Sequence, residues 1–164
     1  MKKDITDEIL KNLRQSLAEQ EEKEVEKDDE KEDDTETSSK NSEFTEMVSR
    51  LLHSQTQVHI FHLGTKGNGS YAAHKALQGY YEGIDALVDG IIESYQGKHG
   101  LVTGYDTYDI SKFESVSQCI SYLEDLGEMI EEKRDSVKES YLQNQIDTIQ
   151  ELLYSTLYKL KFLK

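Results

Sequence analysis

The chain has 164 residues, of which 35% are hydrophobic and 32% are charged, a balance that is typical of one globular domain with additional polar segments. The formal net charge is −14 and the sequence has no basic cluster, so a nucleic-acid backbone would be repelled and no nucleic-acid partner is expected. Cys119 is the only cysteine, which excludes an intrachain disulfide and is consistent with a reducing compartment. The chain contains neither a signal peptide nor the run of roughly eighteen apolar residues that a membrane span needs, so we expect a soluble, cytoplasmic protein without a membrane partner.

Two segments precede the predicted core domain. Residues 4–19 place their apolar side chains on one side of a helical projection, which predicts a short amphipathic N-terminal helix within residues 1–19. A partner protein, the chain's own bundle or a second copy of the segment would serve to bury that apolar face. Residues 20–41 consist almost entirely of Glu, Asp, Lys, Ser and Thr, and we expect them to form a disordered acidic linker.

Residues 42–164 are predicted to form a four-helix bundle. Apolar residues recur at three- and four-residue steps in four segments, which predicts helices over residues 42–64, 70–97, 112–134 and 136–163. Free cysteines are usually buried, so Cys119 is expected in the core as well. The other predicted core residues are Phe44, Met47, Val48, Leu51, Leu52, Leu77, Tyr81, Ile84, Leu87, Val88, Ile91, Tyr95, Phe113, Val116, Ile120, Leu123, Leu126, Ile130, Tyr141, Ile146, Ile149, Leu152, Leu153, Leu157 and Leu160.

The connections between these helices differ in length. Residues 64–70 are rich in glycine and form a loop, in which Ser70 is the expected N-cap of the second helix. Residues 97–111 are long for a connection between neighbouring helices, so we expect this crossover to contain a helical turn or to cover a contact between two copies. Four helices with one long crossover between the second and third predict an all-α, ferritin-like four-helix bundle.

Two histidines and two acids form the most informative pattern of the chain: His62, His74, Asp89 and Glu93. Imidazole nitrogen and carboxylate oxygen suit iron, manganese or zinc. On one helix His74 and Asp89 would lie about 60° apart around the axis and roughly 22 Å apart along it, so no single ion can contact both. An antiparallel second copy of the helix would bring the His74 end of one chain against the Asp89 end of the other. The spacing therefore predicts a two-fold homodimer with two equivalent metal sites, each sharing ligands between the chains.

The stretch from His59 to Glu93 resembles the Dps family, the mini-ferritins known as DNA-binding proteins from starved cells. Beyond the four candidate ligands, the residues that keep the family spacing are Lys66, Gly67, Tyr71, Tyr81 and the run from Asp89 to Glu93. The resemblance implies that the two histidines of one chain and the two carboxylates of its partner form a ferroxidase centre. It also implies that Fe(II) is oxidised by hydrogen peroxide or dioxygen and that the ferric mineral is stored in a hollow cage of twelve subunits.

Two functional hypotheses follow. The first is an iron-oxidising enzyme in which the four candidate ligands are both metal-binding and catalytic, with iron as the metal and zinc or manganese as alternatives. The second is a non-catalytic ferritin-like module that is tethered by its N-terminal helix to a larger assembly. It is motivated by Leu63, Gln78 and Ser94, where the family usually has Trp, an acid and Arg. Ferritin-like relatives also occur in phage genomes, and the protein would then lie in the host cytoplasm or the virion.

Overall fold

The computed structural model describes residues 42–163. They form the helix over residues 42–64, α2 (Ser70–His99), α3 (Val116–Lys133) and α4 (Ser140–Phe162), with a 3-10 turn at Arg134–Ser136 before the last helix. These residues contain no strand, in agreement with the prediction of an all-helical, four-helix domain. The predicted N-terminal helix over residues 4–19 and the predicted linker over residues 20–41 lie outside the described residues and remain predictions.

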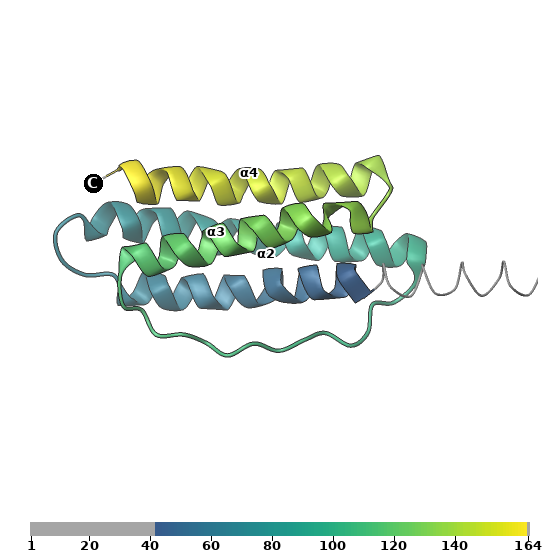
Figure 1. Cartoon of the computed structure of the whole chain (residues 1–164), viewed down its shortest axis with the longest axis horizontal. Helices are drawn as coiled ribbons and strands as arrows, with labels where there is room; N and C mark the ends of the chain where they lie inside the picture. Colours follow the sequence, from purple (N-terminus) through teal and green to yellow (C-terminus); the bar gives the residue numbers. More distant parts are fainter. Residues whose placement is uncertain (1–41, 164) are drawn as a thin grey trace, which may run out of the picture. The chain divides into compact units, whose positions relative to one another are not determined.

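The four helices form two hairpins that lie side by side (Figure 1). The helix over residues 42–64 and α2 form one hairpin, and α3 and α4 form the other; both α2 and α3 pack on α4. Residues 100–115 run along the length of the bundle and connect the end of α2 to the start of α3, so these two helices point in the same direction (Figure 1). The predicted long crossover between the second and third helices is therefore confirmed.

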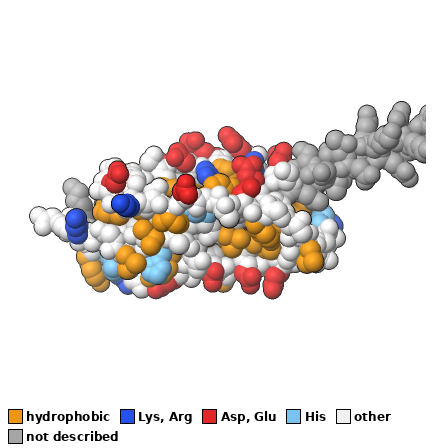
Figure 2. All heavy atoms as spheres, turned by 90° about the horizontal axis from the view of Figure 1, so that it is seen from below, with side chains coloured by type: hydrophobic (Ala, Val, Ile, Leu, Met, Phe, Trp, Pro, Cys, Tyr) orange, Lys and Arg blue, Asp and Glu red, His pale blue; other side chains and the backbone are white. Residues whose placement is uncertain are grey.

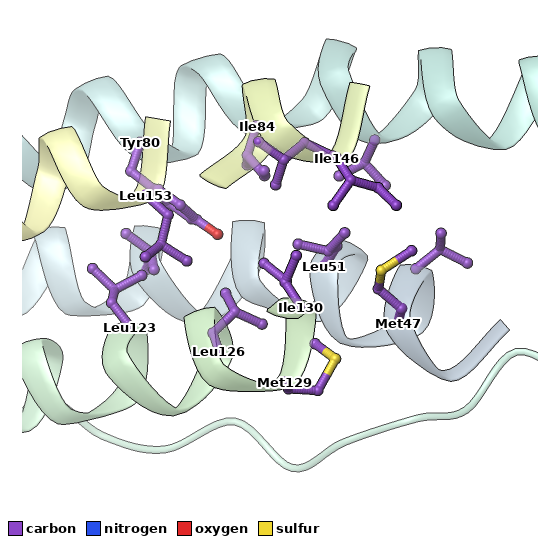
Figure 3. Close-up of a cluster of buried hydrophobic side chains, with 14 of the residues drawn as sticks. Met47, Leu51, Tyr80, Ile84, Leu123, Leu126, Met129, Ile130, Ile146 and Leu153 are labelled. Atoms are coloured by element: carbon purple, nitrogen blue, oxygen red, sulfur yellow. The ribbon is translucent and has the colours of Figure 1, made fainter. Parts of the chain in front are cut away.

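All four helices contribute to one hydrophobic core. Phe44 stacks on Tyr95 with ring centroids 3.7 Å apart. Cys119 is buried as predicted, and burial raises the pKa of its thiol to about 11. Each fully buried aliphatic side chain stabilises the fold by roughly 1.5–3 kcal/mol. Figure 3 shows a part of this core, in which side chains from the four helices point toward one another: Met47, Leu51, Tyr80, Ile84, Leu123, Leu126, Met129, Ile130, Ile146 and Leu153.

Two predicted core positions, Leu52 and Tyr141, are wrong, and a neighbour of a third is the more deeply buried residue. Tyr80 is fully buried, whereas Tyr81, which was expected in the core, is half-buried and packs against it. The Tyr80 hydroxyl is 2.8 Å from Ser54 Oγ, which itself donates to a backbone carbonyl, so the buried phenol has the hydrogen-bond partner that it needs. Burial raises the pKa of Tyr80 and keeps the phenol neutral. Leu52 and Tyr141 are exposed because they face away from the helices that cover their neighbours.

The start of α3 also differs from the prediction. The helix begins at Val116 because Ser115 has an extended backbone and its Oγ accepts a hydrogen bond from the Gln118 N–H, at 3.2 Å. Phe113 therefore lies in the crossover, where it is half-buried and packed against the core. A side chain at Gly64 would collide with Phe113, so the close approach of crossover and helix end requires a glycine there.

The crossover has no helical turn, contrary to one of the two expectations for it. Four of its backbone groups bond polar side chains from successive turns of the helix over residues 42–64, which hold the extended chain along the bundle. The contacts are the Asp106 N–H to Ser49 Oγ (3.1 Å), His53 Nε2 to the Asp109 carbonyl (3.3 Å), and both backbone groups of Ser111 to the Gln57 side-chain amide (2.7 and 2.9 Å).

The surface of the bundle combines acidic and apolar side chains. On the face in Figure 2, acidic side chains lie along both long edges and patches of hydrophobic side chains lie between them. Histidine side chains reach this face near both ends of the bundle (Figure 2). Among residues 42–163, no helix has the length and the apolar run that crossing a membrane requires.

Candidate metal centre

The loop over residues 65–69 reverses the chain between the first two helices. Gly67 and Gly69 have φ values of 93° and 77°, in the left-handed region that glycine adopts without strain. Gly69 occupies the N-cap position of α2 and Ser70 is already helical, so the expected Ser70 cap is wrong. The short loop places the last turn of the helix over residues 42–64 beside the first turns of α2.

His62 and His74 lie at this junction and face each other. Their ring centroids are 3.6 Å apart and the rings are stacked with an angle of 27° between their planes. His62 is buried, with 7% of its surface exposed, and His74 is half-buried. The structure therefore brings together the two histidines that the sequence analysis selected.

Each histidine uses its Nδ1 to bond the backbone of the other. His62 Nδ1 is 3.0 Å from the His74 carbonyl oxygen, and His74 Nδ1 is 3.3 Å from the His62 carbonyl oxygen. A carbonyl can only accept, so these contacts assign the proton of each neutral ring to Nδ1 and leave a lone pair on Nε2. Within residues 42–163 neither Nε2 atom has a hydrogen-bond partner. This is the arrangement in which a histidine binds a metal through Nε2.

Thr65 completes the junction and was missed by the sequence analysis. Its Oγ1 donates to the His62 carbonyl at 2.7 Å and lies 3.3 Å from His74 Nδ1. The hydroxyl thus contacts both of the groups that hold the rings together. The signal in the sequence was the position of Thr65, three residues after His62 in the last turn of the helix. At this spacing a hydroxyl commonly bonds a carbonyl that the helix end leaves free.

Tyr81 and His59 border the histidine pair. Tyr81 meets His62 edge-on, with ring centroids 5.1 Å apart. His59 stacks on Tyr81 at 4.1 Å, and its ring centroid is 5.9 Å from that of His62. His59 is exposed. Tyr81 therefore orients His62 by packing.

Asp89 and Glu93 lie elsewhere on α2. Both are exposed and stand one helical turn apart. The helical rise places Asp89 roughly 22 Å along the axis from His74, so the carboxylates of a chain do not reach its own histidines. In the part of the chain that the structure describes, no three His, Cys, Asp or Glu side chains are grouped so that they could hold a metal ion.

His53 and His99 serve other contacts. His53 Nδ1 is 3.1 Å from the Tyr122 hydroxyl, in addition to its contact with the crossover. His99 Nε2 lies 3.2 Å from a Glu139 carboxylate oxygen, which Lys98 approaches to 2.6 Å. The hydrogen bond from Lys98 holds the pKa of Glu139 below its usual value.

Two of the positions that depart from the Dps pattern have partners of their own. Gln78, one turn after His74, accepts from Lys75 Nζ at 2.6 Å and donates to Glu82 at 2.7 Å. Ser94 accepts a hydrogen bond from Gln145 at 3.2 Å.

Residues 62–160 match the model of a family described as a family of unknown function (DUF5856), and the chain belongs to this family. The matched range begins at His62 and contains all four candidate ligands. No curated protein matches the chain. No solved structure matches it either.

Proposed function

We propose that this protein is a ferritin-like, Dps-type iron-oxidising protein that binds Fe(II) between two antiparallel subunits. In each site His62 and His74 come from one chain, and the carboxylates of Asp89 and Glu93 come from its two-fold partner. Hydrogen peroxide or dioxygen is the oxidant. The observation that carries the proposal is the histidine pair, in which both Nδ1 atoms are bonded to backbone carbonyls and both Nε2 atoms are left without a partner.

The position of the carboxylates supports a site shared between chains. Asp89 and Glu93 are exposed, and they lie about half the length of α2 or more from His74. An antiparallel copy of α2 places them at the histidine end, because a two-fold axis exchanges the two ends of the helix. Two carboxylates then meet two imidazoles, a ligand set that suits iron and leaves coordination positions open.

The hairpin that carries the ligands also has an apolar outer surface. Leu52, Ile60 and Leu63 are exposed on the helix over residues 42–64, and at 100° per residue they lie within about 80° of one another. Tyr71, in the first turn of α2, is exposed as well. Clustered apolar side chains on one face are expected where a second copy covers them.

The topology of the bundle is a further support. Ferritin-like bundles have one long crossover, and metal sites in such bundles are built from side chains on facing helices. The crossover over residues 100–115 connects the second and third helices here.

The proposed chemistry needs little from the protein beyond these ligands. Each hydrogen peroxide molecule takes one electron from each of two Fe(II) ions, its O–O bond breaks, and two protons complete two water molecules. Neutral imidazoles bind Fe(II), and the anionic carboxylates favour the more highly charged ferric product. Zinc or manganese can bind the same donor set, so the metal assignment needs its own measurement.

The test is an anaerobic Fe(II) titration of the full-length protein, followed by a pulse of peroxide. Absorbance records ferric ion, and sedimentation of the same sample records the oligomer. We expect saturable binding, rapid oxidation and an even-numbered oligomer. The matched control is His99→Ala, which removes a histidine outside the proposed site and should leave iron binding unchanged. Unchanged Fe(II) binding after replacement of His62 and His74 would refute the proposal.

The alternative is a ferritin-like interaction module without iron chemistry. It is favoured by Gln78, whose side chain is engaged by Lys75 and Glu82 at a position where the Dps family usually has an acid. Deleting residues 1–41 separates the two functions. An iron-oxidising protein should keep its activity after the deletion, whereas a tethered module should lose its partner.

A further inference from the structure

A groove lies between α3 and α4. Its lining residues are far in the sequence from every proposed metal ligand. It has a volume of about 560 Å³. One wall consists of acidic side chains of α3 and the other of aromatic side chains of α4: Glu124, Asp125 and Glu128, and Tyr154, Tyr158 and Phe162. A volume of this size accommodates several side chains of a bound molecule.

The aromatic wall is unusual for the outer face of an amphipathic helix. Tyr154, Tyr158 and Phe162 follow one another at four-residue steps and are 44%, 57% and 69% exposed. The rings of Tyr158 and Phe162 are in contact, with centroids 5.6 Å apart. Four residues of helix rise by about 6 Å, which matches the spacing of side chains one turn apart on a bound helix. The row therefore offers regularly spaced ring faces to a linear partner.

The acidic wall carries charge that the described residues do not neutralise. Glu124 pairs with Lys161 at 2.6 Å, and among residues 42–163 Lys161 is the one cation that lines the groove. Asp125 and Glu128 have no hydrogen bond or ion pair with any residue in the range 42–163. Their negative charges face an open groove beside aromatic rings, where a cation is attracted both by the carboxylates and by the faces of the rings.

We propose that this groove binds a cationic, amphipathic peptide segment of a partner protein. Arg or Lys side chains of the segment pair with Asp125 and Glu128 and lie over the tyrosine rings, and its apolar side chains pack on Phe162. Charge disfavours a second copy of the chain as the occupant, because two copies that each carry a net charge of −14 repel each other. This binding site is independent of the proposed iron chemistry.

Lys161 competes with a cationic ligand for one carboxylate of the groove. Its ammonium group occupies one end of the groove through the salt bridge to Glu124 and competes there with a cationic ligand. Removing it frees a third carboxylate, so Lys161→Ala should tighten binding. A surface that attracts cations only through the overall charge of the protein would respond far less to this single change.

The experiment uses the full-length protein and a fluorescein-labelled peptide of about sixteen residues, built from Leu, Lys and Arg with helical periodicity. A second peptide has Gln at every basic position. Binding is measured by fluorescence anisotropy. Asp125→Asn with Glu128→Gln removes two groove charges, and Glu114→Gln with Glu151→Gln removes two exposed charges elsewhere as the matched control. Tyr158→Ser with Phe162→Ser is matched by Leu101→Ser, which is also at an exposed apolar position.

We expect each groove double variant to raise the Kd of the basic peptide at least about tenfold. The control variants should change this Kd by less than about twofold. The Gln peptide should bind the wild-type protein at least about tenfold more weakly than the basic peptide. All substituted residues are exposed, and circular dichroism verifies that the variants are folded. Equal effects of the groove and control charge variants would overturn the proposal and leave only general attraction to an acidic protein. A change of sedimentation coefficient caused by the groove variants would also overturn it, because the groove would then be a contact between copies.

Discussion

Two of the three histidines on the helix over residues 42–64, His53 and His62, differ in how their ring nitrogens are hydrogen-bonded. His53 has a partner at both nitrogens, the Tyr122 hydroxyl at 3.1 Å and the Asp109 carbonyl at 3.3 Å. His62 has a partner at Nδ1 only, the His74 carbonyl at 3.0 Å. Both side chains are at least partly buried, so burial does not distinguish them. A candidate metal ligand is therefore recognised by a ring nitrogen that has no hydrogen-bond partner among residues 42–163, as His62 Nε2 has none.

The largest effect is expected from replacing both histidines of the pair. His62→Ala with His74→Ala should reduce iron oxidation by about 100-fold or more, because losing supporting contacts alone commonly costs 10- to 100-fold. The bundle should keep its helicity, since its core lies elsewhere. Stopped-flow absorbance and circular dichroism measure the two quantities. Oxidation at the normal rate would contradict the ligand assignment.

His53→Phe should lower the stability of the fold and leave iron oxidation nearly unchanged, the reverse of the histidine-pair variant. It leaves the Tyr122 hydroxyl and the Asp109 carbonyl without their partner, and the free energy of unfolding should fall by about 1–3 kcal/mol. Iron oxidation should stay within about twofold of the wild type, because the free nitrogens of the pair are untouched. Urea unfolding and the oxidation assay are run on the same preparation. A loss of oxidation at unchanged stability would remove the distinction between the two histidines.

Thr65→Val tests how the pair is held in place. The substitution preserves the shape and removes the hydroxyl that donates to the His62 carbonyl and approaches His74 Nδ1. Fe(II) binding should weaken by about tenfold, the lower end of what supporting contacts contribute to metal sites. Thr65→Ser retains the hydroxyl and should restore the affinity. If Val and Ser give the same affinity, the hydroxyl does not position the rings.

The smallest expected effect is the contribution of His53 to the pH dependence of the free energy of unfolding. Burial, with a smaller contribution from Arg50, holds the pKa of His53 below its usual value, and the bond to the Asp109 carbonyl opposes this in part. The folded state therefore favours neutral His53, and this contribution is present above the unfolded pKa of about 6.5 and is lost as the pH falls toward the folded-state value. The groups that face His53 are Arg50, Tyr108, Tyr122 and the Asp109 backbone.

The stability difference between wild type and His53→Phe should therefore shrink on going from about pH 7.5 to about pH 5.5. Urea unfolding at the two pH values measures it. A difference that grows as the pH falls would mean that protonated His53 is the form that the folded state prefers.

Helical periodicity was sufficient to predict four helices, the long crossover and most core positions, because each helix is amphipathic over several turns. It could not choose between Tyr80 and Tyr81, which both lie beside the apolar stripe. The choice depends on Ser54 of another helix, which bonds the Tyr80 hydroxyl. The path of the crossover likewise depends on side chains more than fifty residues away, such as Gln57 with Ser111.

Part of the candidate site was also predictable from the sequence. The sequence predicted a glycine-rich loop between the first two helices and a site that takes both His62 and His74 from one chain. The structure has this loop and stacks the two histidine rings beside it. The proton positions were not predictable, because they depend on which carbonyls remain free at the helix end. The His62 carbonyl is one of these, and it accepts from Thr65 and from His74.

The central claim is that the iron site is shared between two chains, and a mixing experiment tests it most directly. One variant lacks the histidines (His62→Ala, His74→Ala) and the other lacks the acids (Asp89→Ala, Glu93→Ala), so each is expected to be inactive alone. After the two are unfolded together in equal amounts and refolded, random pairing gives one intact site in four, and about a quarter of the wild-type oxidation should return. No recovery, with the mixed oligomer verified by sedimentation, would contradict a site built from the histidines of one chain and the carboxylates of its partner.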